Sequence, residues 1–130
     1  MTEDTPNEES QISEIDVSDP ECLFCRIVSG EIPADIVADG EHVIAFRDVN
    51  PVAPVHVLVI PREHHPDIGS LAVAEPESLV ELVRLARTIA QEQSGGEYRL
   101  VANTGGAAGQ TVHHAHAHVL GGRDMTWPPG

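Results

Sequence analysis

The sequence predicts an α+β fold, a five-stranded antiparallel sheet that carries one long and one short helix. Between residues 76 and 93, apolar side chains recur every three or four positions, which predicts an amphipathic helix. Five shorter segments are rich in β-branched residues or alternate apolar and polar residues, as is typical of strands. Because regular helices do not separate these segments, an antiparallel sheet fits them better than repeated βαβ units.

Capping and turn residues set the order of the elements. Asp19 and Pro20 are typical of a helix N-terminus, and Gly30 is typical of a helix end. The pair Asp39-Gly40 is a hairpin turn signal. The expected order is a short helix over residues 21–29, strands over 36–38, 42–47 and 55–60, the long helix over 76–93, and strands over 98–102 and 112–120.

Charge is distributed unevenly along the 130 residues, whose formal net charge is −14. Residues 1–19 hold seven acids and no base, which predicts a disordered acidic tail in front of a single folded domain over residues 20–130. The domain itself keeps fourteen acids against seven arginines. An acidic surface of this kind does not suit a nucleic acid polymer as partner.

The sequence also bears on the cellular compartment. No apolar run reaches the roughly 18 residues of a membrane helix, and the polar, acidic N-terminus is unlike a signal peptide. We therefore expect a cytoplasmic protein with no membrane partner. In that compartment, a structural disulfide between Cys22 and Cys25 is not expected.

Three histidines occupy alternate positions, His114, His116 and His118, within the last predicted strand. Side chains two residues apart in a strand share a face, so the three imidazoles are expected to project together. Such a row can hold a metal, or can present a neutral imidazole as a nucleophile. Several potential cations on one strand face are unfavourable without such a use.

The pair Cys22 and Cys25 forms a C-x-x-C motif in the first predicted helix. The motif alone is compatible with a redox pair, half of a metal site, or two buried thiols. A tetrahedral zinc site needs two further ligands, for which His64 or His65 and then His114 are candidates. Zinc held by four protein side chains has no open coordination position and would be structural.

Other segments carry weaker signals. Asp48 opens a Pro-rich loop, where its carboxylate can bind a ribose diol or cap a turn. His56 lies in an apolar strand, as a hydrogen-bonded core residue or as a ligand. The Gly-rich loop over residues 105–109 can surround a phosphate with N–H groups and leads to the hydroxyl of Thr111. Four residues are candidates for core or for the walls of a base pocket: Phe24, Ile27, Phe46 and Val49.

Taken together, these segments resemble the histidine triad (HIT) superfamily, and within it the Hint branch of nucleoside phosphoramidases. The most specific part is the histidine row followed by Gly-Gly-Arg and a terminal Trp-Pro-Pro-Gly. The resemblance covers about residues 20–130 and is carried by residues 22–27, 30–33, 46–48, 54–61, 109–123 and 127–130.

This resemblance implies a homodimer in which the partner's sheet continues the five-stranded sheet. It implies hydrolysis or transfer at the α-phosphorus of a purine nucleotide, such as AMP or GMP in an amide, through a nucleotidyl-histidine on His116. His118, His56 and Thr111 would assist. The implied nucleotide-binding residues are Phe24, Ile27, Phe46, Asp48, Val49, Asn103, Gly109, Gln110, Thr111, His116, His118 and Trp127. Catalysis would need no cofactor, and the implied structural zinc site is Cys22, Cys25, His64 and His114.

Three other functions are compatible with the same residues. A dinucleoside polyphosphate hydrolase, as in the Fhit-like branch, uses similar chemistry, although the Trp-Pro-Pro-Gly ending favours the Hint branch. A nucleotide-binding scaffold or regulatory protein could use the acidic tail as its partner-binding arm. A metal-storage or metal-catalytic site could be built on the three histidines, and it would place a metal at His116.

Overall fold

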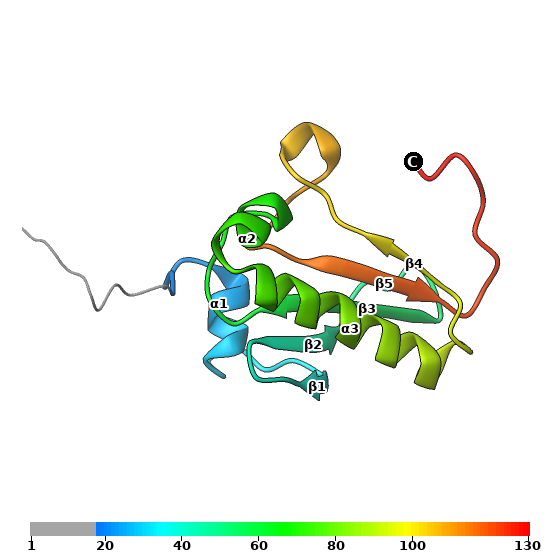
Figure 1. Cartoon of the computed structure of the whole chain (residues 1–130), viewed down its shortest axis with the longest axis horizontal. Coiled ribbons are helices and arrows are strands. Elements are labelled where there is room, and N and C mark those ends of the chain that lie inside the picture. The colour runs from blue at the N-terminus through cyan, green and yellow to red at the C-terminus, as the bar shows by residue number, and fades with distance from the viewer. Residues whose placement is uncertain (1–17) are drawn as a thin grey trace, which may run out of the picture.

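The computed structural model of the chain describes residues 18–130. The acidic tail predicted over residues 1–19 therefore lies outside the described residues, except for its last two positions. Five strands form one antiparallel sheet in the order β1-β2-β3-β5-β4 (Figure 1). The helices and strands are α1 Leu23–Val28, β1 Ile36–Asp39, β2 Val43–Arg47, β3 Val55–Pro61, α2 Ile68–Ala74, α3 Pro76–Gln93, β4 Tyr98–Val101 and β5 Ala117–Gly121.

The predicted α+β class and the antiparallel sheet are confirmed. The long helix α3 has the predicted bounds, and β1 and β2 form the predicted hairpin. No helix in residues 18–130 is both long and apolar enough to cross a membrane.

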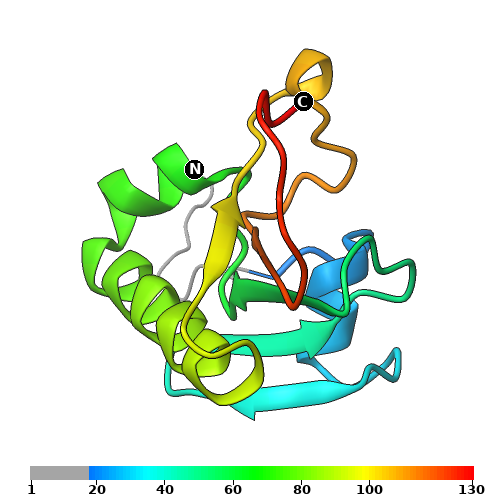
Figure 2. The same cartoon turned by 90° about the vertical axis from the view of Figure 1, so that its right-hand side faces the viewer.

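The central strand β3 is buried on both faces of the sheet, which explains its unbroken apolar sequence. Val57 and Val59 belong to a core cluster formed with α2 and α3. Leu58 and Ile60 belong to a second cluster formed with α1. Because side chains alternate faces along a strand, α1 and α3 cover opposite faces of the sheet (Figure 2).

The short helix α1 begins later than predicted. Its N-cap is Cys22, whose Sγ accepts from the N–H of Cys25 (3.4 Å), and not Asp19. Asp19 instead accepts from the N–H of Glu21 (2.9 Å) and forms a turn before the helix. The C-x-x-C spacing thus places one thiol at the helix N-terminus and the other within its first turn.

The helix α2 was not predicted from the sequence. Asp67 is its N-cap, and its carboxylate accepts from the N–H of Ser70 (2.8 Å). The hydrogen bond to this N–H lowers the pKa of the Asp67 carboxyl. Leu71 is the only fully buried residue of this seven-residue helix and Ile68 packs beside it, so the apolar pattern is too short to predict a helix.

The strand predicted over residues 112–120 begins only at Ala117. Its ladder with β3 stops there because Pro61 has no N–H, and because the Pro61 carbonyl oxygen accepts from the Nε2–H of His114 (2.9 Å). His114 and His116 therefore lie in the irregular segment before β5. Only His118 of the three lies in a strand. The rings still lie on one side of the sheet, because His114 and His116 both pack against Phe24 of α1 and the His116 and His118 centroids are 5.2 Å apart.

Candidate active site

His56 and His118 face each other where β3 and β5 lie side by side, with 3.0 Å between His56 Nε2 and His118 Nδ1. The N–H of Val52 donates to His56 Nδ1 (3.1 Å). In neutral His56 the proton therefore lies on Nε2 and is donated to His118 Nδ1. The proton of neutral His118 then lies on its own Nε2, which makes that atom a hydrogen-bond donor.

Burial keeps His118 neutral. The pKa of His118 is lowered from 6.5 to about 4, mainly by loss of solvent and further by the neighbouring His116 and His56. Asp48 acts in the opposite direction but does not offset the burial. At neutral pH this ring is a donor without charge.

We expect the lowered His118 pKa to make the fold less stable in acid. Below pH 6.5 the unfolded chain binds a proton that the folded chain does not, so the free energy of unfolding falls between pH 6.5 and about 4. The loss amounts to at most about 3 kcal/mol for this group. Urea unfolding of the wild type and of His118→Gln at pH 7 and pH 5 measures it.

The variant is expected to lose less stability between these pH values than the wild type. His113→Gln, which changes an exposed neighbouring histidine, is the matched control and should follow the wild type. Equal losses in the wild type and in His118→Gln would contradict the assigned pKa.

His116 is buried and has one fixed hydrogen bond. Its Nδ1 lies 2.7 Å from the carbonyl oxygen of His114, so Nδ1 carries the proton and Nε2 carries the lone pair. The ring of Phe24 packs edge-on against it, with centroids 5.2 Å apart and planes at 89°. The His118 ring centroid also lies 5.2 Å away. The imidazole is thus held in one orientation and one tautomer.

A cavity of about 710 Å³ opens beside His116 and His118. The predicted site residues that line it are Phe24, Ile27, Phe46, Asp48, Val49, Thr111, His116 and His118. Val49 is 90% exposed, so it forms only the rim. Leu58 was not predicted from the sequence, and it lines the cavity because it pairs directly with His118. Its position two residues after His56 on β3 was the signal that could have identified it.

Asp48 has two contacts, one that caps a turn and one that faces the histidines at the cavity. Its Oδ1 accepts from the N–H of Asn50 (2.8 Å) and caps the turn. Its Oδ2 lies 3.4 Å from His56 Nε2 at the edge of the cavity. The carboxylate is therefore fixed at the cavity mouth with one oxygen beside the histidines.

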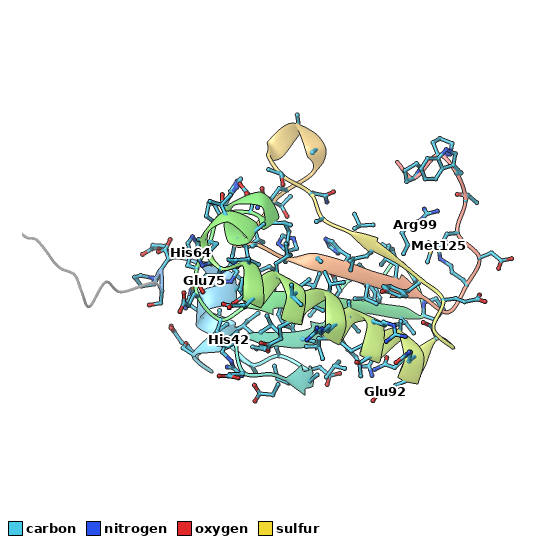
Figure 3. The ribbon with its side chains drawn as sticks, viewed as in Figure 1. His42, His64, Glu75, Glu92, Arg99 and Met125 are labelled. Atoms are coloured by element: carbon cyan, nitrogen blue, oxygen red, sulfur yellow. The ribbon has the colours of Figure 1, made fainter. Side chains whose placement is uncertain are left out.

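Asn103 and Trp127 do not line this cavity. Asn103 lines a second cavity of about 460 Å³, which adjoins His56 and His118 from the side of β4. The C-terminal tail runs back along β4, where Arg99 donates to the carbonyl of Thr126 (2.9 Å; Figure 3). Trp127 is 81% exposed.

The Gly-rich loop is held by its own hydrogen bonds. Gly109 has a φ of 96°, a conformation that favours glycine. The buried Gln110 side chain accepts from the N–H of Gly105 (2.8 Å) and donates to the carbonyl of Pro66 (2.7 Å). The N–H groups of residues 108–110 donate within the loop. The loop's N–H groups expected around a phosphate are thus already paired at these three positions.

The two thiols and two histidines form a compact cluster next to the cavity. His114 Nδ1 lies 3.4 Å from Cys22 Sγ and 3.5 Å from Cys25 Sγ. Cys25 Sγ lies 3.4 Å from His64 Nδ1. All four ligand atoms lie within 4.8 Å of one another. The structure places His64, and not His65, beside the thiols.

The chemistry of this donor set fits a zinc ion. Around tetrahedral zinc, sulfur and nitrogen ligands are about 3.6 Å apart, close to the S···N distances here. His114 donates from Nε2 to the carbonyl of Pro61, so its Nδ1 lone pair faces the sulfurs. Burial raises the pKa of the Cys25 thiol to about 11 and lowers the pKa of His114 to about 4. A thiolate at this place therefore needs a metal cation as its partner.

His114 joins the cluster to the cavity. Its ring faces the thiols, and its carbonyl oxygen accepts from His116 Nδ1. Phe24 packs edge-on against both rings, with a centroid distance of 5.8 Å to His114. Anything that moves His114 therefore changes the hydrogen bond that sets the tautomer of His116.

Comparisons with known proteins agree with this geometry. Residues 29–125 match the family model for the HIT domain. An uncharacterized HIT-like protein from Synechococcus elongatus is 49% identical over 112 residues, which cover 83% of this chain and 96% of the relative. A 14 kDa zinc-binding protein from Zea mays is 42% identical over 118 residues, covering 88% and 91%.

Solved structures agree as well. A HIT family hydrolase from Legionella pneumophila superposes with a TM-score of 0.80 at 46% identity, covering 85% of this chain and 100% of that one. The residues matched by the family model include the segment with the three alternating histidines. The chain therefore belongs to the HIT family.

Proposed function

We propose that the protein hydrolyses, or transfers, nucleotidyl groups at the α-phosphorus of a purine nucleotide, with nucleoside 5′-phosphoramidates as substrates. The observation that carries the proposal is the fixed tautomer of His116. Its Nδ1 proton is bound by a carbonyl, so a neutral Nε2 lone pair is available beside a cavity large enough for a nucleotide.

In the first step, the His116 Nε2–P bond forms and the P–N bond of the phosphoramidate breaks. The leaving nitrogen takes up a proton from a water molecule and departs as a neutral amine. In the second step, water attacks phosphorus, the Nε2–P bond breaks, and the nucleoside monophosphate leaves. Dividing the displacement into two steps lowers each barrier.

His118 is placed to stabilise the charge that develops on the phosphoryl oxygens. The relay from Val52 through His56 puts a proton on His118 Nε2, and the lowered pKa of His118 keeps that ring uncharged. A neutral donor of this kind can donate a hydrogen bond to an anionic phosphoryl oxygen while carrying no charge of its own. The hydrogen bond is oriented before the substrate arrives, which is the basis of electrostatic stabilisation.

The rest of the nucleotide would occupy the apolar end of the cavity. Phe24 and Phe46 lie edge to face there, with ring centroids 5.6 Å apart, and could pack against a purine. Asp48, fixed at the cavity mouth, is the acceptor for the ribose hydroxyls. A base recognised by apolar contact alone does not distinguish adenine from guanine.

We also propose that zinc binds Cys22, Cys25, His64 and His114. The ion would supply no chemistry to the reaction. It would bind the N-terminus of α1 to the segment before β5 and so hold His114, whose carbonyl orients His116. Support comes from the donor set described above and from the zinc-binding relative of Zea mays. Catalysis itself would need no cofactor.

A homodimer is part of the proposal. The strand β4 lies at one edge of the sheet, and its Leu100 is 39% exposed. A second copy that pairs along this edge would continue the sheet and bury that side chain. It would also bring another chain towards the exposed Trp127 and the second cavity. Sedimentation velocity of the full chain, with a dimer expected, measures this.

One experiment tests the proposed reaction directly. Adenosine 5′-phosphoramidate and diadenosine polyphosphates are assayed side by side, and quenched reactions are analysed by intact mass and peptide mapping. We expect faster turnover of the phosphoramidate and a nucleotidyl adduct on His116. Preference for the diadenosine compounds would assign the chain to the other hydrolase activity. Absence of any adduct at saturating substrate would contradict the covalent mechanism.

A further inference from the structure

The second histidine of the adjacent pair, His65, has no place in the proposed reaction or in the thiol cluster. Its side chain turns the other way and is only 15% exposed. Its Nε2 atom is fully buried and has no hydrogen-bond partner among the described residues. A buried, unpaired imidazole nitrogen costs free energy unless a ligand satisfies it.

The carboxylates of Glu63 and Glu75 lie near this nitrogen. Glu63 Oε1 lies 3.8 Å from His65 Nε2, too far for a hydrogen bond. Glu75, at the joint between α2 and α3, offers a third ligand atom, and the three atoms lie within 4.8 Å of one another. Ligand atoms that each lie about 2 Å from one cation are at most about 4 Å apart, so small side-chain movements would bring these three atoms to a shared ion.

A cavity of about 100 Å³ lies at the same place. Three carboxylates and one guanidinium lie around it, and its lining residues are Glu41, His42, Pro61, Arg62, Glu63, His65, Leu71, Glu75 and Ser78. Figure 3 shows Glu75 and His42 at the same end of the molecule as His64. The volume admits an ion with one or two water molecules, and the surrounding carboxylates make its potential negative.

The basic groups nearby are paired with other acceptors. The Arg62 guanidinium donates to the carboxylate of Asp39 and to the carbonyl of Gly40. His42 is held by Glu81, with 2.9 Å between His42 Nδ1 and Glu81 Oε1. The pKa of His42 is raised, first by this hydrogen bond and then by the charges of Glu41, Glu81 and Glu75. Its other ring nitrogen lies 3.7 Å from Glu41. The carboxylates Glu63 and Glu75 therefore remain available to a cation.

We propose that Glu63, His65 and Glu75 bind a divalent transition-metal ion at a second site, separate from the thiol cluster. One imidazole nitrogen with carboxylate oxygens is a donor set that suits Mn²⁺, Co²⁺, Ni²⁺ or Zn²⁺, with water completing the coordination. The thiol cluster, in contrast, selects softer ions. The two sites differ in chemistry, although His64 and His65 are adjacent.

The second site would act as a clamp. His65 and Glu63 lie in the loop between β3 and α2, whereas Glu75 lies at the start of α3. The carbonyl of His65 also accepts from the N–H of Ala115 (2.7 Å), next to the histidines of the active site. A bound ion would therefore tie this loop to the helix joint and stabilise the folded chain by mass action.

The test uses Mn²⁺ as the probe and the full chain as the protein. Free Mn²⁺ is followed by its EPR signal in buffer that contains a tenfold excess of Mg²⁺. Mg²⁺ competes for sites made of carboxylates alone, but imidazole is a poor ligand for it. We expect one Mn²⁺ per chain, and we expect Mn²⁺ to raise the melting temperature of the wild type.

Variants assign the ion to the site. His65→Ala and Glu75→Gln are each expected to weaken Mn²⁺ binding at least tenfold and to abolish the rise in melting temperature. Glu77→Gln, which changes an acid in the same first turn of α3, is the matched control and should bind as the wild type does.

Cys22→Ser combined with Cys25→Ser should leave Mn²⁺ binding unchanged, since the thiols belong to the other cluster. Failure of Mn²⁺ to bind at millimolar concentration would overturn the proposal. So would a loss smaller than tenfold in both His65→Ala and Glu75→Gln, because binding would then be spread over the acidic surface.

Discussion

Replacing His116 by alanine is expected to abolish turnover while nucleotide binding stays measurable. Without the Nε2 lone pair no covalent intermediate forms, and we expect the single-turnover rate constant to fall at least about 10⁴-fold. In the proposed mode, binding of a nucleoside monophosphate depends mainly on the apolar walls and Asp48, which the substitution does not change. Calorimetric titration with AMP or GMP should therefore give a dissociation constant within about tenfold of the wild-type value.

The matched control for this prediction is His113→Ala, which removes an exposed imidazole three positions away. It should turn over phosphoramidate at the wild-type rate. Near wild-type turnover by His116→Ala would eliminate the proposed nucleophile. A metal-catalytic mechanism built on the three histidines makes a different prediction, since it requires loss of activity with a chelator and a metal bound at His116.

Removing the thiol cluster is expected to have the second largest effect. Its main consequence is a loss of stability of the folded chain. Cys22→Ser with Cys25→Ser should lower the zinc content by one ion per chain, as measured by elemental analysis. Metal that binds only the folded chain stabilises it by several kcal/mol, so we expect the melting temperature to fall by about 10 °C or more. Scanning calorimetry of metal-loaded wild type and variant measures this.

The same double substitution should also affect the reaction, through His114. The carbonyl of His114 sets the tautomer of His116, so loosening it should reduce kcat more than it raises KM. Equal zinc content and equal melting temperature in wild type and variant would contradict the zinc proposal. That result would leave the nucleophile assignment intact, because the two predictions are measured independently.

The elements predicted best from the sequence are those whose pattern of apolar residues follows from burial. Apolar residues at helical spacing gave α3 its bounds, and the apolar run at residues 55–60 marked β3 because both faces of that strand are covered. Elements that depend on a few local contacts were missed. The helix α2 has one fully buried residue, and its start depends on the Asp67 cap.

The residue types of the site were predictable from the sequence. Which histidine belongs to the cavity and which to the thiol cluster was not. Alternation predicted that the three imidazoles project together, and they do, although only His118 lies in a strand. The His114 ring turns towards the thiols because Pro61 of β3 accepts its Nε2–H. No pattern near residue 114 contains that information, because Pro61 lies more than fifty positions earlier.

By itself, the sequence determined the fold class, the long helix, the family resemblance and the set of groups able to bind phosphorus or metal. These follow from the periodicity of apolar side chains and from residue types within short segments. The tertiary structure alone decided which imidazole nitrogen carries a proton, which histidine joins the thiols, and that His65 lies against two carboxylates. Each of these depends on a hydrogen bond or a charge supplied by another element of the fold, and such partners meet only when the sheet assembles.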